Sequence, residues 1–164
     1  MRLLHRGTEG QNQTVYERAA LEGSPRPKGS TRQMIDAFRE GAISAGHTVE
    51  IADVCKMKIE GCLACEYCHT KGKRECVQKD EMQKIYALLG DAQMLVIASP
   101  IYYHGISGQL KCAIDRFYSA AYPVGPSNLK MAAMIFKGKK EKRQKIPNFG
   151  NFLMPFVRMR LILS

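Results

Sequence analysis

The feature that most constrains this chain is residues 61–76, which hold four of its six cysteines. The four follow the spacing C-x2-C-x2-C-x7-C and are Cys62, Cys65, Cys68 and Cys76. Three thiols spaced three residues apart can turn toward one small centre, and the fourth can reach back across a loop that contains Gly72. This cysteine run resembles compact iron–sulfur ligation more than a zinc ribbon, which usually separates two C-x2-C pairs widely. The alternatives are four unrelated thiols or a disulfide-bonded pair.

Length and composition predict one globular domain around these cysteines. The chain has 164 residues, of which 45% are hydrophobic. No apolar run reaches the roughly 18 residues of a membrane span, and Arg2 and Arg6 interrupt the start too early for a signal peptide. We therefore expect a cytoplasmic protein that binds no membrane, in which thiols ligate or do redox chemistry rather than form disulfides.

The net charge of +10 does not indicate a nucleic-acid partner, because it is confined to one end. Residues 128–164 hold nine Lys or Arg and one acid, whereas the other 127 residues hold sixteen Lys or Arg and fourteen acids. A local basic run such as residues 137–145 is usually a solvated loop. The chain also lacks Trp and any aromatic stripe on which bases could stack.

Alternating strand and helix patterns predict the fold class. Strands are expected, in chain order, at residues 15–21, 47–53, 94–98 and 129–136. Helices between them begin near Ser30, Asp80 and Ser107, each of which can cap a helix N-terminus, and the first helix ends at Gly46. Residues 94–98 are apolar throughout, as in a parallel strand buried on both faces. The alternation predicts an α/β doubly wound parallel sheet.

The loop of residues 23–31 is a candidate phosphate site, and we call it the phosphate loop. It leads into a helix start, where free N–H groups and the helix dipole attract anions. Ser24, Ser30 and Thr31 add hydroxyl groups, and Arg26 adds a charged fork. The alternative is an ordinary loop with an N-cap. Neither the Walker A spacing nor G-x-G-x-x-G is present.

A second candidate is residues 99–107, which we call the aromatic loop. It follows the buried strand at the sheet edge where doubly wound folds bind ligands. Pro100 restricts the chain, and Tyr102, Tyr103 and His104 can present flat surfaces to a flat ring. The alternative is surface packing of these three side chains.

Together these motifs resemble the flavodoxin-like, NAD(P)H-dependent FMN reductase family, and the cysteine spacing resembles its iron–sulfur flavoprotein branch. The resemblance rests on residues 23–31, the cysteine run leading to residue 82, residues 99–103 and residues 109–116. It covers roughly residues 20–136. It implies a flavodoxin-like fold and an oxidoreductase that needs no protein nucleophile or acid–base pair. The implied cofactors are FMN and a [4Fe–4S] cluster, with NAD(P)H as reductant.

The resemblance also implies roles for individual residues. The FMN phosphate would lie on Ser24, Arg26, Ser30 and Thr31. The isoalloxazine would rest on the aromatic loop, at Pro100, Ile101, Tyr102, Tyr103 and His104, with Ser107 nearby. The cluster would be held by Cys62, Cys65, Cys68 and Cys76. The implied partners are a small-molecule or small redox-protein acceptor and further copies of the chain in a homo-oligomer.

The two ends depart from the family pattern. We expect a disordered or extraneous lead at residues 1–14, a flavodoxin-like FMN-binding domain at 15–136 with a cysteine-rich loop at 55–78, and an atypical tail at 137–164. The sheet is therefore expected to be truncated or altered after its fourth strand. Two other functions remain open: an FMN or quinone reductase without a cluster, and a zinc-stabilised binding module without flavin. We expect Asp115 and Arg116 to make a local contact on a helix surface.

Overall fold

A computed structural model describes residues 17–121, 128–138 and 158–163. Its elements, including two short 3-10 helices marked η, are β1 (Glu17–Glu22), α1 (Ser30–Ser44), β2 (Thr48–Asp53), η1 (Val54–Lys56), η2 (Tyr67–His69), α2 (Met82–Asp91), β3 (Met94–Pro100), α3 (Gly108–Asp115), α4 (Tyr118–Ala121), β4 (Met131–Lys137) and β5 (Arg158–Leu163). The predicted lead and most of the basic run lie outside the described residues. No helix in the described ranges is both long and apolar enough to cross a membrane.

The strands form one parallel sheet in the order β2-β1-β3-β4-β5. This is the order of flavodoxin-like doubly wound folds, so the predicted fold class is confirmed. The weak first strand occupies a central position, and its residues Ala19, Ala20 and Leu21 are fully buried. Glu17 and Arg18, which obscured the pattern, lie at its start, where the burial is incomplete.

The expected truncation after the fourth strand is corrected by β5. It pairs with β4 over six residues, from Met131 opposite Arg158 to Phe136 opposite Leu163, so β4 is not the sheet edge. The sequence hides this strand because two arginines break its apolar pattern and a long segment separates it from β4. Backbone pairing with a neighbouring strand does not need that pattern.

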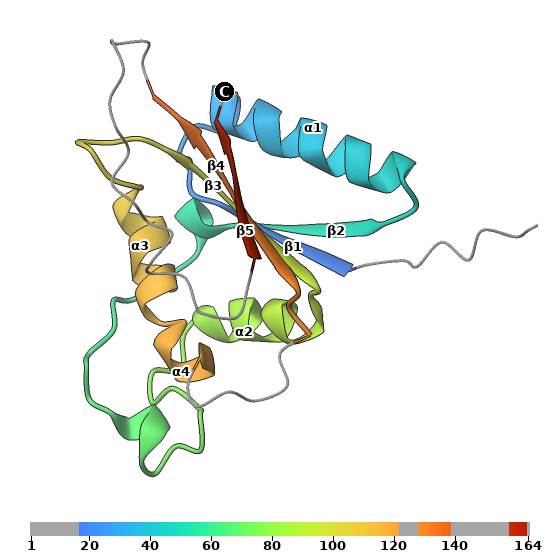
Figure 1. Cartoon of the computed structure of the whole chain (residues 1–164). Helices are drawn as coiled ribbons and strands as arrows, with labels where there is room; N and C mark the ends of the chain where they lie inside the picture. The colour runs from blue at the N-terminus through green and yellow to red at the C-terminus, as the bar shows by residue number, and fades with distance from the viewer. Residues whose placement is uncertain (1–16, 122–127, 139–157, 164) are drawn as a thin grey trace, which may run out of the picture.

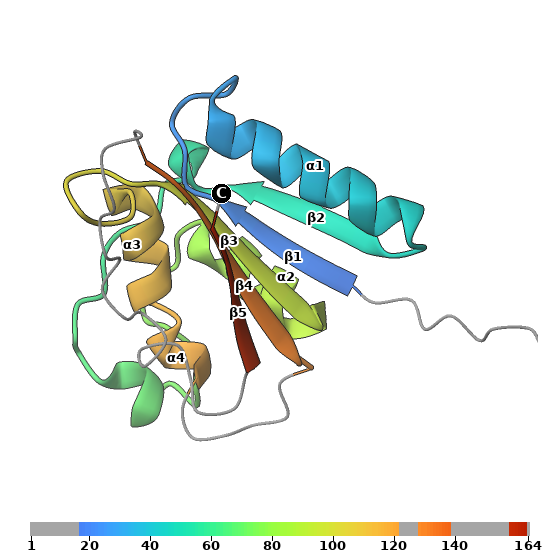
Figure 2. The ribbon, with the colours of Figure 1, turned by 45° about the horizontal axis from the view of Figure 1, so that its top comes forward.

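Helices cover both faces of the sheet, with α1 on one side and α2 and α3 on the other (Figures 1 and 2). The core under α1 contains Ala20, Ile35, Val96, Ala98, Ala133 and Ile135. The core under α2 and α3 contains Leu21, Met82, Ile85, Ile97, Leu110 and Met134. Neighbouring residues of β1, β3 and β4 thus serve opposite cores, as the period of a strand requires. A sheet buried in this way leaves its loops at the strand ends for function.

Helix α1 joins the phosphate loop to this core. Its N-cap is Gly29, one residue before the predicted Ser30, and no side chain caps it. Ile35 and Ala42 are buried along one side. The helix ends at Ser44 with Ala45 as its C-cap, and the predicted glycine follows: Gly46 has φ 77°, and the N–H of His47 donates to the carbonyl of Ala42.

Candidate functional site

The phosphate loop and the aromatic loop meet at the carboxyl edge of the sheet, because β1 and β3 are adjacent and parallel. The N–H of Gly23 donates to the carbonyl of Ala98 at 2.8 Å. A Cβ added to Gly23 would lie only 2.9 Å from the Ser107 hydroxyl oxygen. Two loops that the sequence places about 75 residues apart therefore form one site.

The phosphate loop presents donors at the start of α1. Ser24 and Thr31 are buried, whereas Arg26 and Ser30 are exposed. The N–H of Arg26 donates to the Ser24 hydroxyl oxygen at 3.2 Å, which fixes the turn. Among the described residues the Arg26 guanidinium has no carboxylate partner. These features suit an anion at the helix N-terminus, where the first N–H groups have no partner inside the helix.

The aromatic loop ends in a tight turn that exposes flat rings. Tyr102 and Gly105 exchange two backbone hydrogen bonds of 2.8 and 3.0 Å. The residues between them, Tyr103 and His104, have φ of 43° and 65°, which side-chain-bearing residues rarely adopt. Tyr103 is 100% exposed, and its ring meets that of His104 edge-on with centroids 5.7 Å apart. Strain of this kind is found at ligand-binding loops.

The remaining residues predicted for the aromatic loop anchor it to the sheet. Pro100 and Ile101 are half-buried, and the N–H of Ile101 donates to the carbonyl of Lys137 at the end of β4. Ser107 is fully buried, and its N–H donates to the hydroxyl oxygen of Ser99 at 3.1 Å. Ser107 is also the N-cap of α3, as predicted.

A buried carboxylate under the phosphate loop was missed by sequence reasoning. Glu22 ends β1 with 1% exposure, and Arg32 of α1 donates to it at 2.9 Å. Burial raises the pKa of Glu22, against the opposing effect of Arg32. Asp53 stands opposite Glu22 in the sheet register and raises that pKa further. Only the position of Glu22 directly before Gly23 could have suggested its place at the site.

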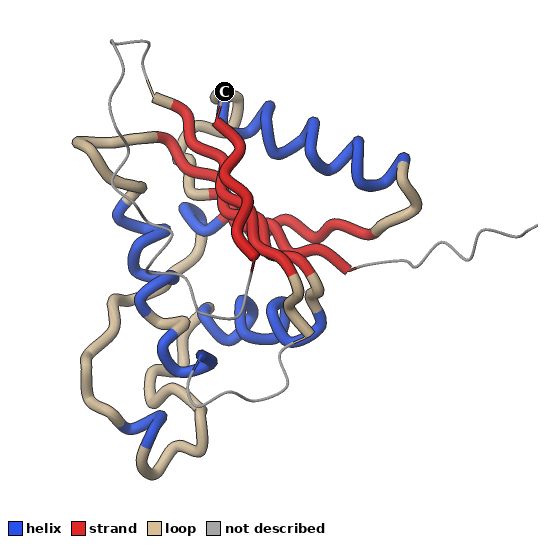
Figure 3. The backbone as a smooth tube through the Cα atoms, viewed as in Figure 1, coloured by secondary structure: helices blue, strands red, loops and turns tan. Residues whose placement is uncertain are grey.

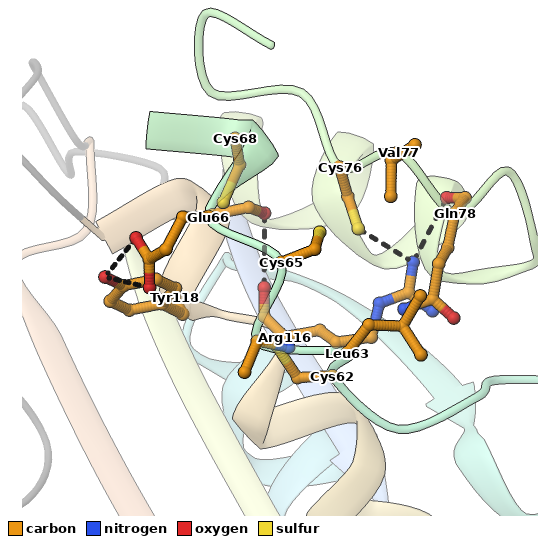
Figure 4. A pocket seen from close by; sticks show the side chains of 12 residues that line it. Cys62, Leu63, Cys65, Glu66, Cys68, Cys76, Val77, Gln78, Arg116 and Tyr118 are labelled. Carbon is orange, nitrogen blue, oxygen red and sulfur yellow. Dashed lines mark hydrogen bonds between the residues drawn. The ribbon is translucent and has the colours of Figure 1, made fainter. Parts of the chain in front are cut away.

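The cysteine run forms the second part of the site, almost entirely as loop (Figure 3). All four thiols line one pocket, shown in Figure 4, and all are free. Cys62 and Cys65 are exposed, while Cys68 and Cys76 are half-buried. Burial raises the pKa of the Cys68 thiol. The structure thus brings together the four cysteines that the spacing predicted to share one centre.

The donor set fits a cysteine-ligated cluster in its chemistry, though the thiols are not arranged around a metal-sized centre. Nowhere in the described ranges do three or more His, Cys, Asp or Glu side chains form a metal-binding group. The space at this pocket that the centre of a water-sized molecule can reach is about 20 Å³, room for about one water molecule.

Hydrogen bonds tie together the two ends of the cysteine run. The N–H of Glu60 donates to Asp80 at 3.0 Å, and that of Lys58 donates to Glu81 at 2.7 Å. The amide of Gln78 donates to the carbonyl of Gly61 at 3.0 Å. The run is therefore a closed loop whose ends are held beside the start of α2.

Inside the run, the backbone bends sharply around Cys65. Ala64 and Glu66 have φ of 50° and 56°. The Tyr118 hydroxyl donates to Glu66 at 3.0 Å, and His69 makes a 3.0 Å hydrogen bond with the Tyr118 carbonyl. Helix α4 thus supports the cysteine run from one side.

Arg116 lies where sequence reasoning did not expect it. It has 1% exposure and forms a buried ion pair with Asp80, whereas Asp115 alone makes the expected local contact, with Lys111. Although burial opposes it, hydrogen bonds to Asp80 and Cys76 raise the pKa of Arg116. Leu110, Ala113 and Arg116 follow one another at intervals of three residues, which could have placed Arg116 on the inward side of α3.

Helix α3 connects the two parts of the site. It begins after Ser107 in the aromatic loop and ends before Arg116 at the cysteine run. Its eight residues correspond to a rise of about 12 Å. In Figure 1 the aromatic loop lies at one end of α3, and the cysteine run lies beyond the other end.

Comparisons with known proteins agree with this geometry. The sequence model of the NADPH-dependent FMN reductase family matches residues 18–148. An iron–sulfur flavoprotein of Archaeoglobus fulgidus is 37% identical over 94 residues, which are 57% of this chain and 42% of that protein. An iron–sulfur flavoprotein of Methanocaldococcus jannaschii is 35% identical over 96 residues, 58% of this chain and 48% of that protein. The matched region thus spans about half the length of these curated relatives.

A solved structure shows the same fold. The NAD(P)H:quinone oxidoreductase from Methanothermobacter marburgensis superposes with a TM-score of 0.68 over 92% of this chain and 85% of that chain. The two sequences are 17% identical, so the likeness concerns the fold alone.

Proposed function

The chain belongs to the NADPH-dependent FMN reductase family, and on that premise we propose that it is an FMN-dependent oxidoreductase. NAD(P)H or another reductant would supply electrons, and a small molecule or small redox protein would accept them. The observation that carries the proposal is the meeting of the phosphate loop and the aromatic loop at the β1/β3 edge. Doubly wound folds bind ligands at such a switch in strand order.

The residues of the two loops have separate roles in this proposal. Ser24, Ser30, Thr31 and the open start of α1 would hold the phosphate, with Arg26 adding a charge-assisted hydrogen bond. The strained turn at Tyr103 and His104 would support the ring system. FMN, when bound, supplies the redox chemistry, since it takes two electrons and can release them singly. The side chains bind, orient and shield the cofactor and need not form bonds with the substrate.

We further propose that the four cysteines hold a [4Fe–4S] cluster. Support comes from the gathering of all four thiols at one pocket and from the curated relatives, which are named iron–sulfur flavoproteins. A second candidate is a flavin-dependent quinone reductase whose cysteines carry no cluster, since the thiols in the described ranges are not grouped around a metal-sized centre. Family membership disfavours the zinc-stabilised module without flavin.

We propose that the working form is a homo-oligomer. Apolar side chains around the cysteine pocket are exposed to an unusual degree: Leu63 is 64%, Val77 is 45% and Tyr118 is 43% exposed. A second copy could cover this surface. It could also bring its own phosphate loop and aromatic loop closer to the cysteine pocket than those of the same chain, which lie at the other end of α3. Sedimentation of the flavin-loaded protein tests this, and a monomer at micromolar concentration would contradict it.

A visible spectrum of anaerobically purified protein separates the candidates. Flavin bands with a broad shoulder in the blue indicate both cofactors, and flavin bands alone indicate the reductase without a cluster. A colourless protein that takes up no added FMN would refute the oxidoreductase proposal. Oxidation of NADH and of NADPH with a quinone then identifies the preferred reductant.

A further inference from the structure

We propose that Arg116 is a positioning residue of the cysteine site, with two effects. It clamps together the two ends of the cysteine run, and it holds a buried positive charge against Cys76. That charge favours the reduced form of the cluster. The redox effect rests on the proposed function, whereas the clamp does not.

We infer the clamp from the positions of the Arg116 partners along the chain. Nη1 donates to the Glu60 carbonyl at 3.3 Å, before the first cysteine of the run. Nη2 donates to the Cys76 sulfur at 3.5 Å and to the Gln78 carbonyl at 3.2 Å, at and after the last cysteine. Nη1 also pairs with Asp80, which itself accepts from the Glu60 N–H. One side chain therefore binds both ends of the run, as Figure 4 shows for the Cys76 and Gln78 end.

The backbone of Arg116 is held in place by hydrogen bonds. Its carbonyl accepts from the Tyr86 hydroxyl of α2 at 2.9 Å and from the Ser119 hydroxyl at 3.2 Å. Its N–H donates to the Ala113 carbonyl at 3.1 Å. A fork held in this way by α2 and α3 fixes the position of Cys76, the ligand separated from the other three by seven residues.

The electrostatic effect follows from burial. Arg116 is 1% exposed, so water screens its charge weakly. Asp80 balances part of that charge, and it also accepts hydrogen bonds from the N–H groups of Glu60 and Met82. Reduction adds one electron to the cluster, and hydrogen bonds to ligand sulfurs are one determinant of its potential. The hydrogen bond from Nη2 of Arg116 to the Cys76 sulfur therefore favours the reduced cluster, which carries one more negative charge.

A redox titration with dithionite, followed by the visible spectrum of the cofactor-loaded protein, tests the electrostatic effect. Arg116→Met should lower the equilibrium constant for one-electron reduction at least about tenfold, a shift of about 59 mV to lower potential. Arg116→Lys keeps the charge but loses the planar fork, so it should restore most of that shift. The control is Lys79→Met, which removes a 62% exposed cation next to the run and should change the constant less than about twofold.

Hydrogen exchange of the same proteins tests the clamp. Arg116→Met and Arg116→Lys should both speed exchange of the N–H groups of Lys58 and Glu60 about tenfold or more, while Lys79→Met should not. An unchanged potential in Arg116→Met with a full cluster would overturn the electrostatic effect, and unchanged exchange in both Arg116 variants would overturn the clamp. If Arg116→Met does not fold, hydrogen exchange in Arg116→Lys tests the clamp. The reduction potential of Arg116→Lys must then stay close to that of the parent protein. Parent protein without iron and sulfide would refute the cluster and the redox effect together, and exchange would still decide the clamp.

Discussion

Replacing Gly23 by alanine should disturb the flavin site from inside the protein. Gly23 joins β1 to the phosphate loop and lies against the start of α3. An added Cβ would lie 2.7 Å from Cδ2 of Leu110, 2.9 Å from its Cβ and 2.9 Å from the Ser107 hydroxyl oxygen. Leu110 and Ser107 are both fully buried, so neither can turn away into solvent.

The expected cost follows from these contacts. Overpacking a buried site costs about 1–3 kcal/mol. The lower entropy of the unfolded alanine chain returns about 0.4–1 kcal/mol. The free energy of unfolding should therefore fall by about 1–2 kcal/mol. If α3 shifts to make room, the aromatic loop moves with Ser107, and FMN should bind more weakly, by about tenfold for each 1.4 kcal/mol of binding free energy lost.

Urea unfolding of the cofactor-free protein and titration with FMN measure the two effects separately. Gly41→Ala is the matched control, because nothing lies within 4 Å of a Cβ at that position in α1. It should stabilise the protein by about 0.5–1 kcal/mol and leave FMN affinity unchanged. Gly23→Ala protein with parental stability and parental FMN affinity would refute the close packing of the two loops.

Three further predictions concern other parts of the chain. Arg26→Ala should weaken FMN about ten- to a hundredfold and riboflavin hardly at all, because only FMN carries the phosphate; equal losses in calorimetric titrations would contradict this. Asp80→Asn should cost about 3 kcal/mol at pH 7, since it breaks a buried ion pair. Burial alone would raise the pKa of Asp80, but Arg116 and two N–H groups hold it below its ordinary value. The difference in unfolding free energy between the parent and Asp80→Asn should therefore have its full size above about pH 3.9 and shrink below it, as measured by urea titrations. A difference that does not depend on pH would contradict the ion pair. A chain that ends after Gly138 lacks β5, so it should self-associate through the bare edge of β4 in light scattering, whereas a stable monomer would contradict the pairing.

Local patterns in the sequence were enough to predict the fold class and the places of the phosphate loop and the aromatic loop in it. The apolar run of β3 and the glycine after α1 reflect strand burial and backbone conformation, which depend on few neighbours. Helix starts were predicted to within a few residues for the same reason. The order of the loops along the chain then placed both of them at the carboxyl edge of one sheet.

What the sequence did not reveal depends on contacts between distant residues. Arg116 and Asp80 are 36 residues apart, and neither residue type signals that Arg116 will be buried against Asp80. Glu22 looks like the polar end of a strand until α1 covers it with Arg32. Strand β5 is defined by pairing with β4 rather than by its own pattern. The roles of the flavin-loop residues and of the four cysteines remain predictions.

The iron and acid-labile sulfide content of anaerobically prepared protein tests whether the four cysteines hold a cluster. We expect about four irons and four sulfides per chain, as for a cluster ligated by four cysteines. Cys76→Ala should lose most of both. Cys112 lies in α3 and does not line the cysteine pocket, so Cys112→Ala should keep them, and FMN should remain bound in each variant. Stoichiometric zinc without sulfide, or a full cluster in Cys76→Ala, would contradict the account.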